Sequence, residues 1–521
     1  GETPLELAGV DADATSARRF QSHRAETNGL MRTEFHEIRD PATDRLVKIT
    51  ARQFHTFAWG EGLVAETFGA GPGALTNTFD YYPNGLLKLV QRHDGSWESY
   101  EYDDRSRTNK IFSAFGNQAP TNDSALCRLV EMNYSLTALA PAGDDPKLEP
   151  NRPRRTVEYL LGHEVSRAYC IVRPHERIDI QCQTAGAAFD APDNFFTTNR
   201  FWTAGPTQGK LKAVLRGNGS CELYDYRPHP QGTLTIVDSG WPAAPLPGAG
   251  EPAAILKGIS RITLNGPAGE LLARTNLWIS PEAPQGRVIN VETFDNSGAS
   301  DGPGSRNNSA RTILDLNQDC CGGHLSAPGE PPAASQGDDA LPRQVTTLAN
   351  GVVISNRLDA AGNVIAITRQ ATNGQVVTLA TQTFDTAGRL TSTTDALGHT
   401  TAYSYGAEAD GGRLVKVSLP DGGTRIQRYY RDGSLFQVRG NAAFPLTFTQ
   451  GIEGDGAGRT NAFFKIERGQ AGEWTKTYMD MLGRRYRTVY PGESGSLPGS
   501  VPESYDTGYD QGRVKREVDP D

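Results

Sequence analysis

A short acidic-glycine signature recurs along the chain and constrains its fold more than any other feature. Asp-x-x-Gly occurs at Asp359–Gly362, Asp385–Gly388 and Asp395–Gly398, and a β-type run follows each copy. An aspartate side chain accepts hydrogen bonds from the backbone two residues on, and glycine adopts a positive φ at little cost. The signature therefore predicts a tight turn that joins two short strands.

The spacing of these turns predicts a stacked repeat. Asp385 and Asp395 are ten residues apart, which leaves room for one strand and one turn. Looser copies of the turn are marked by Gly433, Gly483, Asp510 and Gly512. Self-similarity of this kind is typical of repeat proteins, in which each unit buries its face against its neighbours. We therefore expect an all-β protein built from a long antiparallel sheet.

Composition limits the classes of function. The 521 residues exceed one ordinary core, and the 57 glycines suit a chain rich in turns. A net charge of −9 excludes a large nucleic-acid footprint, and we read the cluster Arg152, Arg154 and Arg155 as a loop or strand edge. No apolar run reaches the ~18 residues of a membrane helix. The first residues do not resemble a signal peptide, and the last stop in mid-repeat, so we expect a piece of a longer protein.

Breaks in the repeat pattern divide the chain into four stretches. Residues 1–78 are expected to be mixed, with a short helix within Asp13–Leu30. Residues 79–324 carry degenerate repeats with loop insertions, and residues 325–343 form a Pro/Gly-rich linker or loop. Residues 344–521 form the regular repeat sheet.

One stretch carries a family resemblance. Residues 384–405 run from Phe-Asp-Thr-Ala-Gly-Arg-Leu to Thr-Ala-Tyr-Ser-Tyr. They closely resemble the YD-repeat consensus of bacterial Rhs proteins, with Phe384 in place of the usual tyrosine. The repeats of insecticidal toxin-complex shells and of animal teneurins are similar. The match is strong over residues 351–440, fair over 474–521 and patchy over 79–316.

The resemblance implies a fold and a function. The fold is an antiparallel sheet that spirals into a hollow shell, of which this chain would be a part. The function is that of a structural shell or scaffold, secreted or at the cell surface. In the toxin relatives such a shell encloses a C-terminal toxin domain, so an enclosed domain of the same protein is the expected partner. The acidic self-cleavage motif of the Rhs core is not found here, so neither self-processing nor toxicity is carried over.

The cysteines leave two readings open. Cys170 and Cys182 flank an expected hairpin, and a cross-strand disulfide or two unlinked thiols both fit the sequence. Cys320, Cys321 and His324 could supply metal ligands, but adjacent cysteines fit a structural zinc site poorly. We expect neither a metal nor a cofactor.

No catalytic residue is expected. His163, His175 and His229 lie near acidic residues, but no nucleophile elbow, Walker loop or His-Glu-x-x-His pair accompanies them. The repeat aspartates are interpreted as turn formers, and an enzyme ranks third among the hypotheses. The second hypothesis is an adhesive or carbohydrate-binding module, in which exposed aromatic rings stack on glycans. Recurrent tyrosines are expected mainly as cross-strand ladders: Tyr81, Tyr82, Tyr100, Tyr102, Tyr403, Tyr405, Tyr429, Tyr430 and Tyr478.

Overall fold

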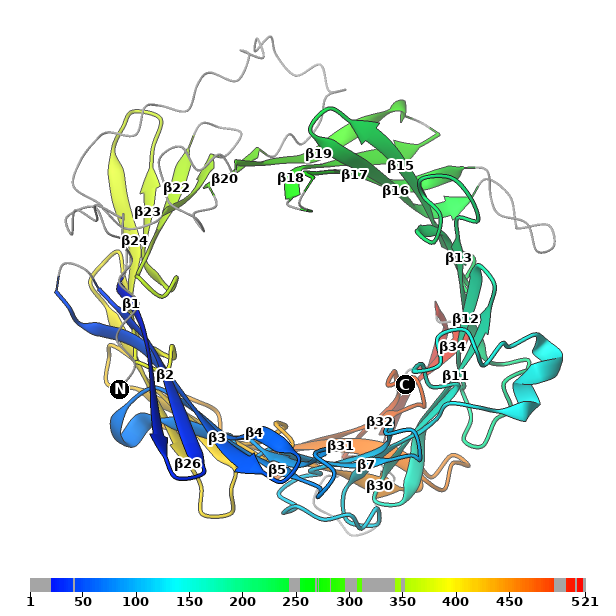
Figure 1. Ribbon diagram of the computed structural model, residues 1–521, viewed down its shortest axis with the longest axis horizontal. Coiled ribbons are helices and arrows are strands. Elements are labelled where there is room, and N and C mark those ends of the chain that lie inside the picture. The colour runs from blue at the N-terminus through cyan, green and yellow to red at the C-terminus, as the bar shows by residue number, and fades with distance from the viewer. Residues whose placement is uncertain are drawn as a thin grey trace. The chain divides into compact units, whose positions relative to one another are not determined.

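The computed structural model describes most of the chain, and nearly all of its elements are β-strands (Figure 1). The described residues are 20–40, 43–242, 254–267, 269, 271–281, 283–295, 307–311, 343–347, 352–491, 503–510 and 513–518. Two short 3-10 helices interrupt the strands, η1 (Gly71–Gly73) and η2 (Thr137–Ala142). The expected all-β class with long antiparallel sheets is confirmed.

The first sheet contains the strands of the N-terminal part of the chain. They are β1 (Phe20–Asn28), β2 (Met31–Arg39), β3 (Leu46–Phe57), β4 (Gly60–Phe68), β5 (Leu75–Tyr81), β6 (Leu87–Gln91), β7 (Trp97–Tyr102), β8 (Thr108–Ser113), β9 (Arg128–Asn133), β10 (Arg155–Leu160), β11 (His163–Arg173), β12 (Glu176–Gln181), β13 (Phe195–Phe201), β14 (Leu211–Arg216), β15 (Cys221–His229), β16 (Gly232–Pro242), β17 (Ile255–Asn265), β18 (Leu271–Ser280), β19 (Ala283–Asp295) and β20 (Asn307–Arg311).

The second sheet contains the remaining strands. They are β21 (Arg343–Thr347), β22 (Val353–Leu358), β23 (Val364–Gln370), β24 (Val376–Phe384), β25 (Leu390–Asp395), β26 (Thr400–Ala407), β27 (Arg413–Ser418), β28 (Thr424–Tyr429), β29 (Leu435–Arg439), β30 (Leu446–Glu453), β31 (Ala462–Gly469), β32 (Trp474–Met479), β33 (Arg485–Tyr490), β34 (Glu503–Asp510) and β35 (Arg513–Val518). In both sheets strands pair antiparallel with their neighbours in the chain, as β2 does with β3 and β27 with β28.

The expected N-terminal helix is wrong for the residues that are described. Phe20–Asn28 and Met31–Arg39 form a hairpin whose register pairs Asn28 with Met31. The two turn residues are therefore Gly29 and Leu30, and Gly29 at the first turn position has the positive φ, 61°, that a type II′ hairpin requires. The turn chemistry therefore overrides the weak helical pattern. Residues 13–19 lie outside the described part.

The chain divides into two compact units. Unit 1 comprises residues 1–76, 271–275 and 287–401, and unit 2 comprises residues 77–270, 276–286 and 402–521. Each unit contains strands from both sheets, so each has contacts between sheets as well as within them.

Each unit has its own buried apolar clusters. In unit 1, Ile38 and Val47 of the first sheet pack against Ala360 of the second. In unit 2, Trp97 is 1% exposed and packs with Phe112, and its indole N–H donates to the carbonyl oxygen of Gln118 at 2.7 Å. These clusters are small, so much of each sheet's stability depends on the strand ladder and the turns.

Candidate functional site

The acidic-glycine signatures form closed hairpin corners, and the corner between β24 and β25 shows the pattern. The backbone N–H of Asp385 donates to the carbonyl oxygen of Arg389 at 3.0 Å, and the N–H of Gly388 donates to the carbonyl oxygen of Asp385 at 2.9 Å. The Asp385 carboxylate accepts the backbone N–H groups of Ala387 and Arg389 at 3.0 and 2.8 Å. Asp359 and Asp395 accept equivalent bonds in their own corners, and Gly362 and Gly398 have φ near +85°.

A second form of the corner places the acid two residues later. In the Tyr430–Ser434 corner, Gly433 N–H donates to Tyr430 O at 3.0 Å, and Ser434 N–H donates to the Asp432 carboxylate at 2.8 Å. Gly483 belongs to the first form, because its N–H donates to Asp480 O at 2.9 Å. Asp510 ends β34, and Gly512 lies outside the described residues.

The corners change the strand register. The pairing shifts by one residue beside the corner at Thr383/Phe384, and likewise at Glu101/Tyr102 and Tyr478/Met479. A turn that ends on a left-handed glycine produces such a bulge and increases the local twist. The corners therefore set both the reversal of the chain and the twist of the sheet.

Within unit 1, a corner of the second sheet is hydrogen-bonded to the first sheet. The backbone oxygen of Thr386 accepts from Ile49 N–H at 3.3 Å, and its hydroxyl oxygen accepts from Ala70 N–H at 3.0 Å. Arg389, held by Asp385, donates to Gly73 O at 3.0 Å. We call a corner with such contacts to the other sheet a docked corner.

Within unit 2, the Tyr430–Ser434 corner is docked in the same way. Asp432 accepts Gly116 N–H on its carboxylate at 2.7 Å and donates its own N–H to Gly116 O at 3.2 Å. Arg431 donates to the carbonyl oxygens of Asp410 and Gly95 at 3.0 and 3.4 Å. The aspartate therefore closes its own turn and joins two sheets.

A pair of corners in unit 2 meets face to face. Gly95 and Gly411 approach so closely that a β-carbon on Gly95 would overlap the carbonyl oxygen of Gly411. Nearby, the amide of Asn117 donates to the Asp410 carboxylate at 2.7 Å. Glycine is thus required at Gly95 for its φ of +86° and also for the contact.

Three of the docked contacts share one sequence offset. The bonds from Ala70 to Thr386, from Arg389 to Gly73 and from Gly116 to Asp432 each join residues 316 positions apart. Four strands, β5 to β8, lie between residues 73 and 116, and four, β25 to β28, lie between residues 389 and 432. The two sheets therefore have the same repeat length over this stretch, so that corners meet corners.

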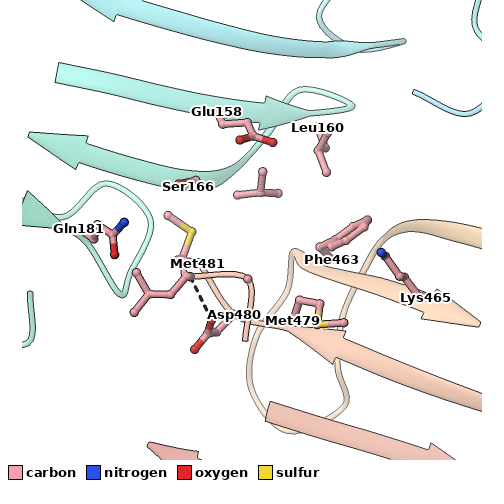
Figure 2. Close-up of a pocket in the computed structure, with 12 residues that line it drawn as sticks. Glu158, Leu160, Ser166, Gln181, Phe463, Lys465, Met479, Asp480 and Met481 are labelled. Atoms are coloured by element: carbon pink, nitrogen blue, oxygen red, sulfur yellow. Dashed lines mark hydrogen bonds between the residues drawn. The ribbon is translucent and has the colours of Figure 1, made fainter. Parts of the chain in front are cut away.

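A groove of about 410 Å³ lies between the sheets within unit 2 (Figure 2). Its lining includes Met479 at the end of β32, Met481 and Leu482 of the β32–β33 corner, and Leu160 with other residues of β10 and β11. One docked contact lies close by, from Arg484 to the side-chain oxygen of Gln183 at 3.1 Å. The groove mixes apolar walls with single charges, such as Lys465.

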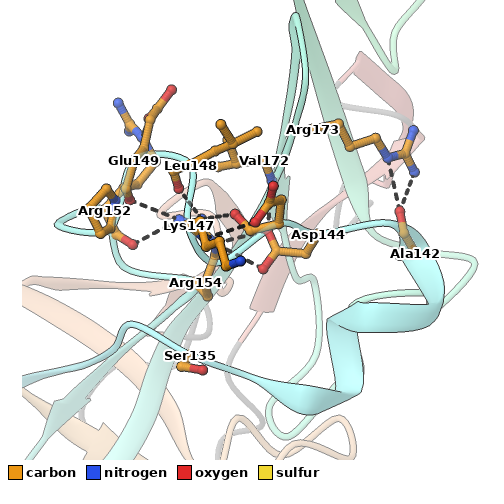
Figure 3. Close-up of polar contacts among 12 residues, drawn as sticks. Ser135, Ala142, Asp144, Lys147, Leu148, Glu149, Arg152, Arg154, Val172 and Arg173 are labelled. Carbon is orange, nitrogen blue, oxygen red and sulfur yellow. Dashed lines mark hydrogen bonds and ion pairs between the residues drawn. The ribbon is translucent and has the colours of Figure 1, made fainter.

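The long connection between β9 and β10 is organised by one buried cation (Figure 3). Arg154 is fully buried and pairs with Asp144, which is 3% exposed and also accepts Val172 N–H at 2.8 Å. The guanidinium donates to four backbone carbonyls, those of Asp145, Leu148, Glu149 and Arg152. Arg154 is thus a loop organiser rather than part of an exposed basic patch, because a planar fork of donors can serve several carbonyls at once.

One recurrent constellation is absent from the sequence-based predictions. In the first sheet, Arg92 and the Tyr100 hydroxyl both donate to Glu98, at 2.9 and 2.5 Å. Arg216 and Tyr224 donate to Glu222 in the same way. Burial and then the hydrogen bond to Glu98 raise the pKa of Tyr100. Alignment of residues 92–102 with 216–226 reveals the shared Arg-x-Asx-Gly-Ser-x-Glu-x-Tyr-x-Tyr pattern.

Several of the recurrent tyrosines are bonded within the sheet. The hydroxyl of Tyr82 donates to Tyr100 O at 2.9 Å, and that of Tyr102 donates to Leu87 O at 2.8 Å. Tyr82 and Tyr102 also make an edge-to-face contact at 6.3 Å. Tyr430 repeats the hydroxyl-to-carbonyl bond to Phe448 O at 3.2 Å. Such cross-strand contacts stabilise sheets.

Cys170 and Cys182 are both buried free thiols, so the disulfide that the sequence left open is not formed. The β11–β12 register pairs Cys170 with Asp179, whereas Cys182 N–H donates to Arg167 O, three residues from Cys170. The two cysteines are therefore not opposite each other. Burial raises the pKa of Cys170 to about 12 and that of Cys182 to about 11.

The candidate histidines are not brought together: His163 begins β11, His229 ends β15, and His175 lies in a turn. His399 belongs to a corner, with Nδ1 3.2 Å from the Asp395 carboxylate, and His175 has the positive φ of a turn between β11 and β12. Among the described residues, no three His, Cys, Asp or Glu side chains are grouped as metal ligands. Cys320, Cys321 and His324 lie outside the described part.

One segment that contains these corners matches a known family model. Residues 384–424 match the family model described as RHS Repeat, and this match includes the docked Asp385–Arg389 corner. The chain therefore contains a segment that matches the RHS repeat. The resemblance to Rhs and YD-repeat proteins seen in the sequence is thereby confirmed.

Solved structures of toxin-complex proteins are similar to this chain at low identity. A crystal structure of TcdB2-TccC3-Cdc42 matches 94% of this chain and 26% of that one, with 12% identity and a TM-score of 0.37. A crystal structure of TcdB2-TccC3 matches 96% of this chain and 28% of that one, with 13% identity and a TM-score of 0.36. A structure of a Tc holotoxin pore of Photorhabdus luminescens matches 96% of this chain and 26% of that one, with 12% identity and a TM-score of 0.33. The chain thus spans less than a third of those chains. No curated protein matches it.

In the described residues, no helix has the length and apolar character needed to cross a membrane.

Proposed function

We propose that the chain is a structural wall segment of a larger bacterial shell or scaffold, which encloses or presents a C-terminal toxin-like domain of the same protein. The observation that carries the proposal is the set of docked corners, which join one long sheet to the other within each unit. The RHS-repeat match supports the same function, because the family resemblance implies a shell.

Secretion or surface display is part of this proposal. The four described cysteines, Cys127, Cys170, Cys182 and Cys221, are all buried free thiols. Burial raises the pKa of each of them, so little reactive thiolate forms at neutral pH. Their chemistry is therefore compatible with an oxidising compartment as well as with a reducing one.

The glycan-binding alternative is not proposed. Tyr82, Tyr102 and Tyr430 donate their hydroxyls to backbone carbonyls of the sheet, and Tyr100 and Tyr478 donate theirs to glutamates. We therefore assign these tyrosines a role in stabilising the sheets.

Small-angle X-ray scattering of the chain tests the wall function. A curved wall around a lumen should give a pair-distance distribution whose maximum is shifted towards long distances. A symmetric distribution typical of a solid globule would contradict the proposal. Enclosure is tested separately on the full natural protein, by limited proteolysis with and without denaturant. The downstream domain should be cut only after the repeat region unfolds, and equal cutting in the two conditions would contradict enclosure.

A further inference from the structure

Three of the corners contain an Asn-Gly dipeptide in a fixed geometry. They are centred on Asn84, Asn218 and Asn373. In each, the asparagine side-chain oxygen accepts the N–H of the residue two positions later, at 3.2, 2.9 and 3.0 Å respectively. In each, the glycine N–H donates to the first carbonyl of the corner at 2.9 Å. In these three Asn-Gly pairs, the glycine nitrogen and the asparagine side-chain amide are thus both engaged.

These contacts oppose the reaction to which Asn-Gly sequences are prone. In that reaction the glycine nitrogen attacks the asparagine side-chain carbonyl carbon and forms a five-membered imide. The displaced amino group takes up a proton and leaves as ammonia, and water then opens the ring to aspartate or isoaspartate. In the Asn218 corner the Gly219 N–H points to Arg216 O, and Ser220 holds the amide oxygen through its N–H and hydroxyl at 2.9 and 2.7 Å. Attack requires these bonds to open.

The aspartate product already has a counterpart in the same sheet. The Arg92–Ser96 corner has Asp94 where the Arg216–Ser220 corner has Asn218. Ser96 donates its N–H and hydroxyl to Asp94 at 3.0 and 2.7 Å, almost as Ser220 does to Asn218. Only the side-chain oxygen that accepts these bonds is needed, and aspartate keeps it.

We propose that Asn84, Asn218 and Asn373 are latent deamidation sites, protected while their hairpins are closed, and that conversion to aspartate leaves the corner intact. The rate of modification then reports on local opening of each hairpin. The isoaspartate product lengthens the backbone and does not fit the corner.

Peptide mapping by mass spectrometry tests protection. The intact chain is incubated at mildly alkaline pH with and without concentrated urea, and deamidation at the three sites is followed in time. The folded chain should react at least about tenfold more slowly at each site, because opening must precede attack. Equal rates in the two conditions would overturn the protection.

Substitution tests the tolerance of aspartate. Asn218→Asp should keep the urea unfolding midpoint of the parent chain, whereas Asn218→Ala, which removes the acceptor oxygen, should lower it. Asp94→Asn is the matched reverse change and should also be tolerated, while it creates a new protected Asn-Gly site. A midpoint for Asn218→Asp as low as that of Asn218→Ala would overturn the inference.

Discussion

Docked and solvent-facing corners have the same local hydrogen bonds but different surroundings. In the corner at Gly374, the glycine N–H donates to Ala371 O at 2.9 Å, as Gly95 does to Arg92 O. A β-carbon on Gly374 would meet nothing within 4 Å, whereas one on Gly95 would overlap Gly411 O. The difference shows that the turn is locally encoded, and that a corner acquires its second role, joining sheets, only from what lies opposite it.

The largest expected effect is the difference in lost unfolding free energy between a glycine of a docked corner and one of a solvent-facing corner. Gly374→Ala should cost about 1 kcal/mol, the price of a left-handed alanine. Gly95→Ala should cost roughly 3 kcal/mol or more, because the backbone at Gly411 must also move. The free energies of unfolding in urea measure both. Equal losses for the two variants would show that Gly95 is not docked.

The second prediction compares two aspartates of the same turn type. Asp432→Ala should cost about 2 kcal/mol, since it removes the acceptor for Gly116 N–H as well as for Ser434 N–H. Asp421→Ala should cost about 1 kcal/mol, because Asp421 accepts Gly423 N–H within its own corner. Urea unfolding of the two variants checks the order. A larger loss at Asp421 would contradict the docking of the Tyr430–Ser434 corner.

Acid should weaken both kinds of corner. The backbone hydrogen bond from His399 is the main cause that lowers the pKa of Asp395 in a solvent-facing corner. For Asp94 in a docked corner, burial would raise the pKa, but the hydrogen bonds from Ser96 outweigh it and the pKa is lowered. An aspartate whose pKa is lowered by folding stabilises the folded chain fully when the pH is above its unfolded-state pKa of about 3.9. This stabilisation is lost as the pH falls through the folded-state pKa.

The urea midpoint should therefore fall as the pH is lowered from about 5 towards 2. Asp395→Asn keeps an acceptor oxygen but does not titrate, so this variant should show a shallower pH dependence than the parent chain. An unchanged slope for Asp395→Asn would mean that the Asp395 corner does not contribute to acid sensitivity.

The smallest expected effect is stabilising. In the Asp103–Arg107 corner, Ser106 occupies the left-handed position with φ of +61°, where the other corners mostly have glycine. Ser106→Gly should raise the free energy of unfolding by about 0.5 kcal/mol or more, because glycine relieves the strained φ. Thermal unfolding measures the gain. A lower melting temperature would indicate that the serine side chain has a contact that outweighs the strain.

The sequence predicts the corners better than their partners. Local turn chemistry and the short spacing between turns predict the corner at Asp385 and Gly388. They also predict the strands on either side and the antiparallel class. The bond from Thr386 to Ala70 does not, because nothing local links residues 316 apart. The β1–β2 hairpin was missed since its alternation is weak, although Gly29 at the first position of the turn indicates it. Arg154 resembled a surface residue because burial of a cation depends on carbonyls that a loop gathers around it.

Contact between the two sheets is tested most directly by a double-mutant cycle on Asn117 and Asp410, whose side chains share a 2.7 Å hydrogen bond in unit 2. The free energies of unfolding of Asn117→Ala, Asp410→Ala and the double variant are compared with that of the parent chain. The docked-corner account predicts a coupling energy of about 1 kcal/mol, typical of a hydrogen bond to a carboxylate. Losses that add to within about 0.3 kcal/mol would contradict it, because residues without a shared contact behave additively.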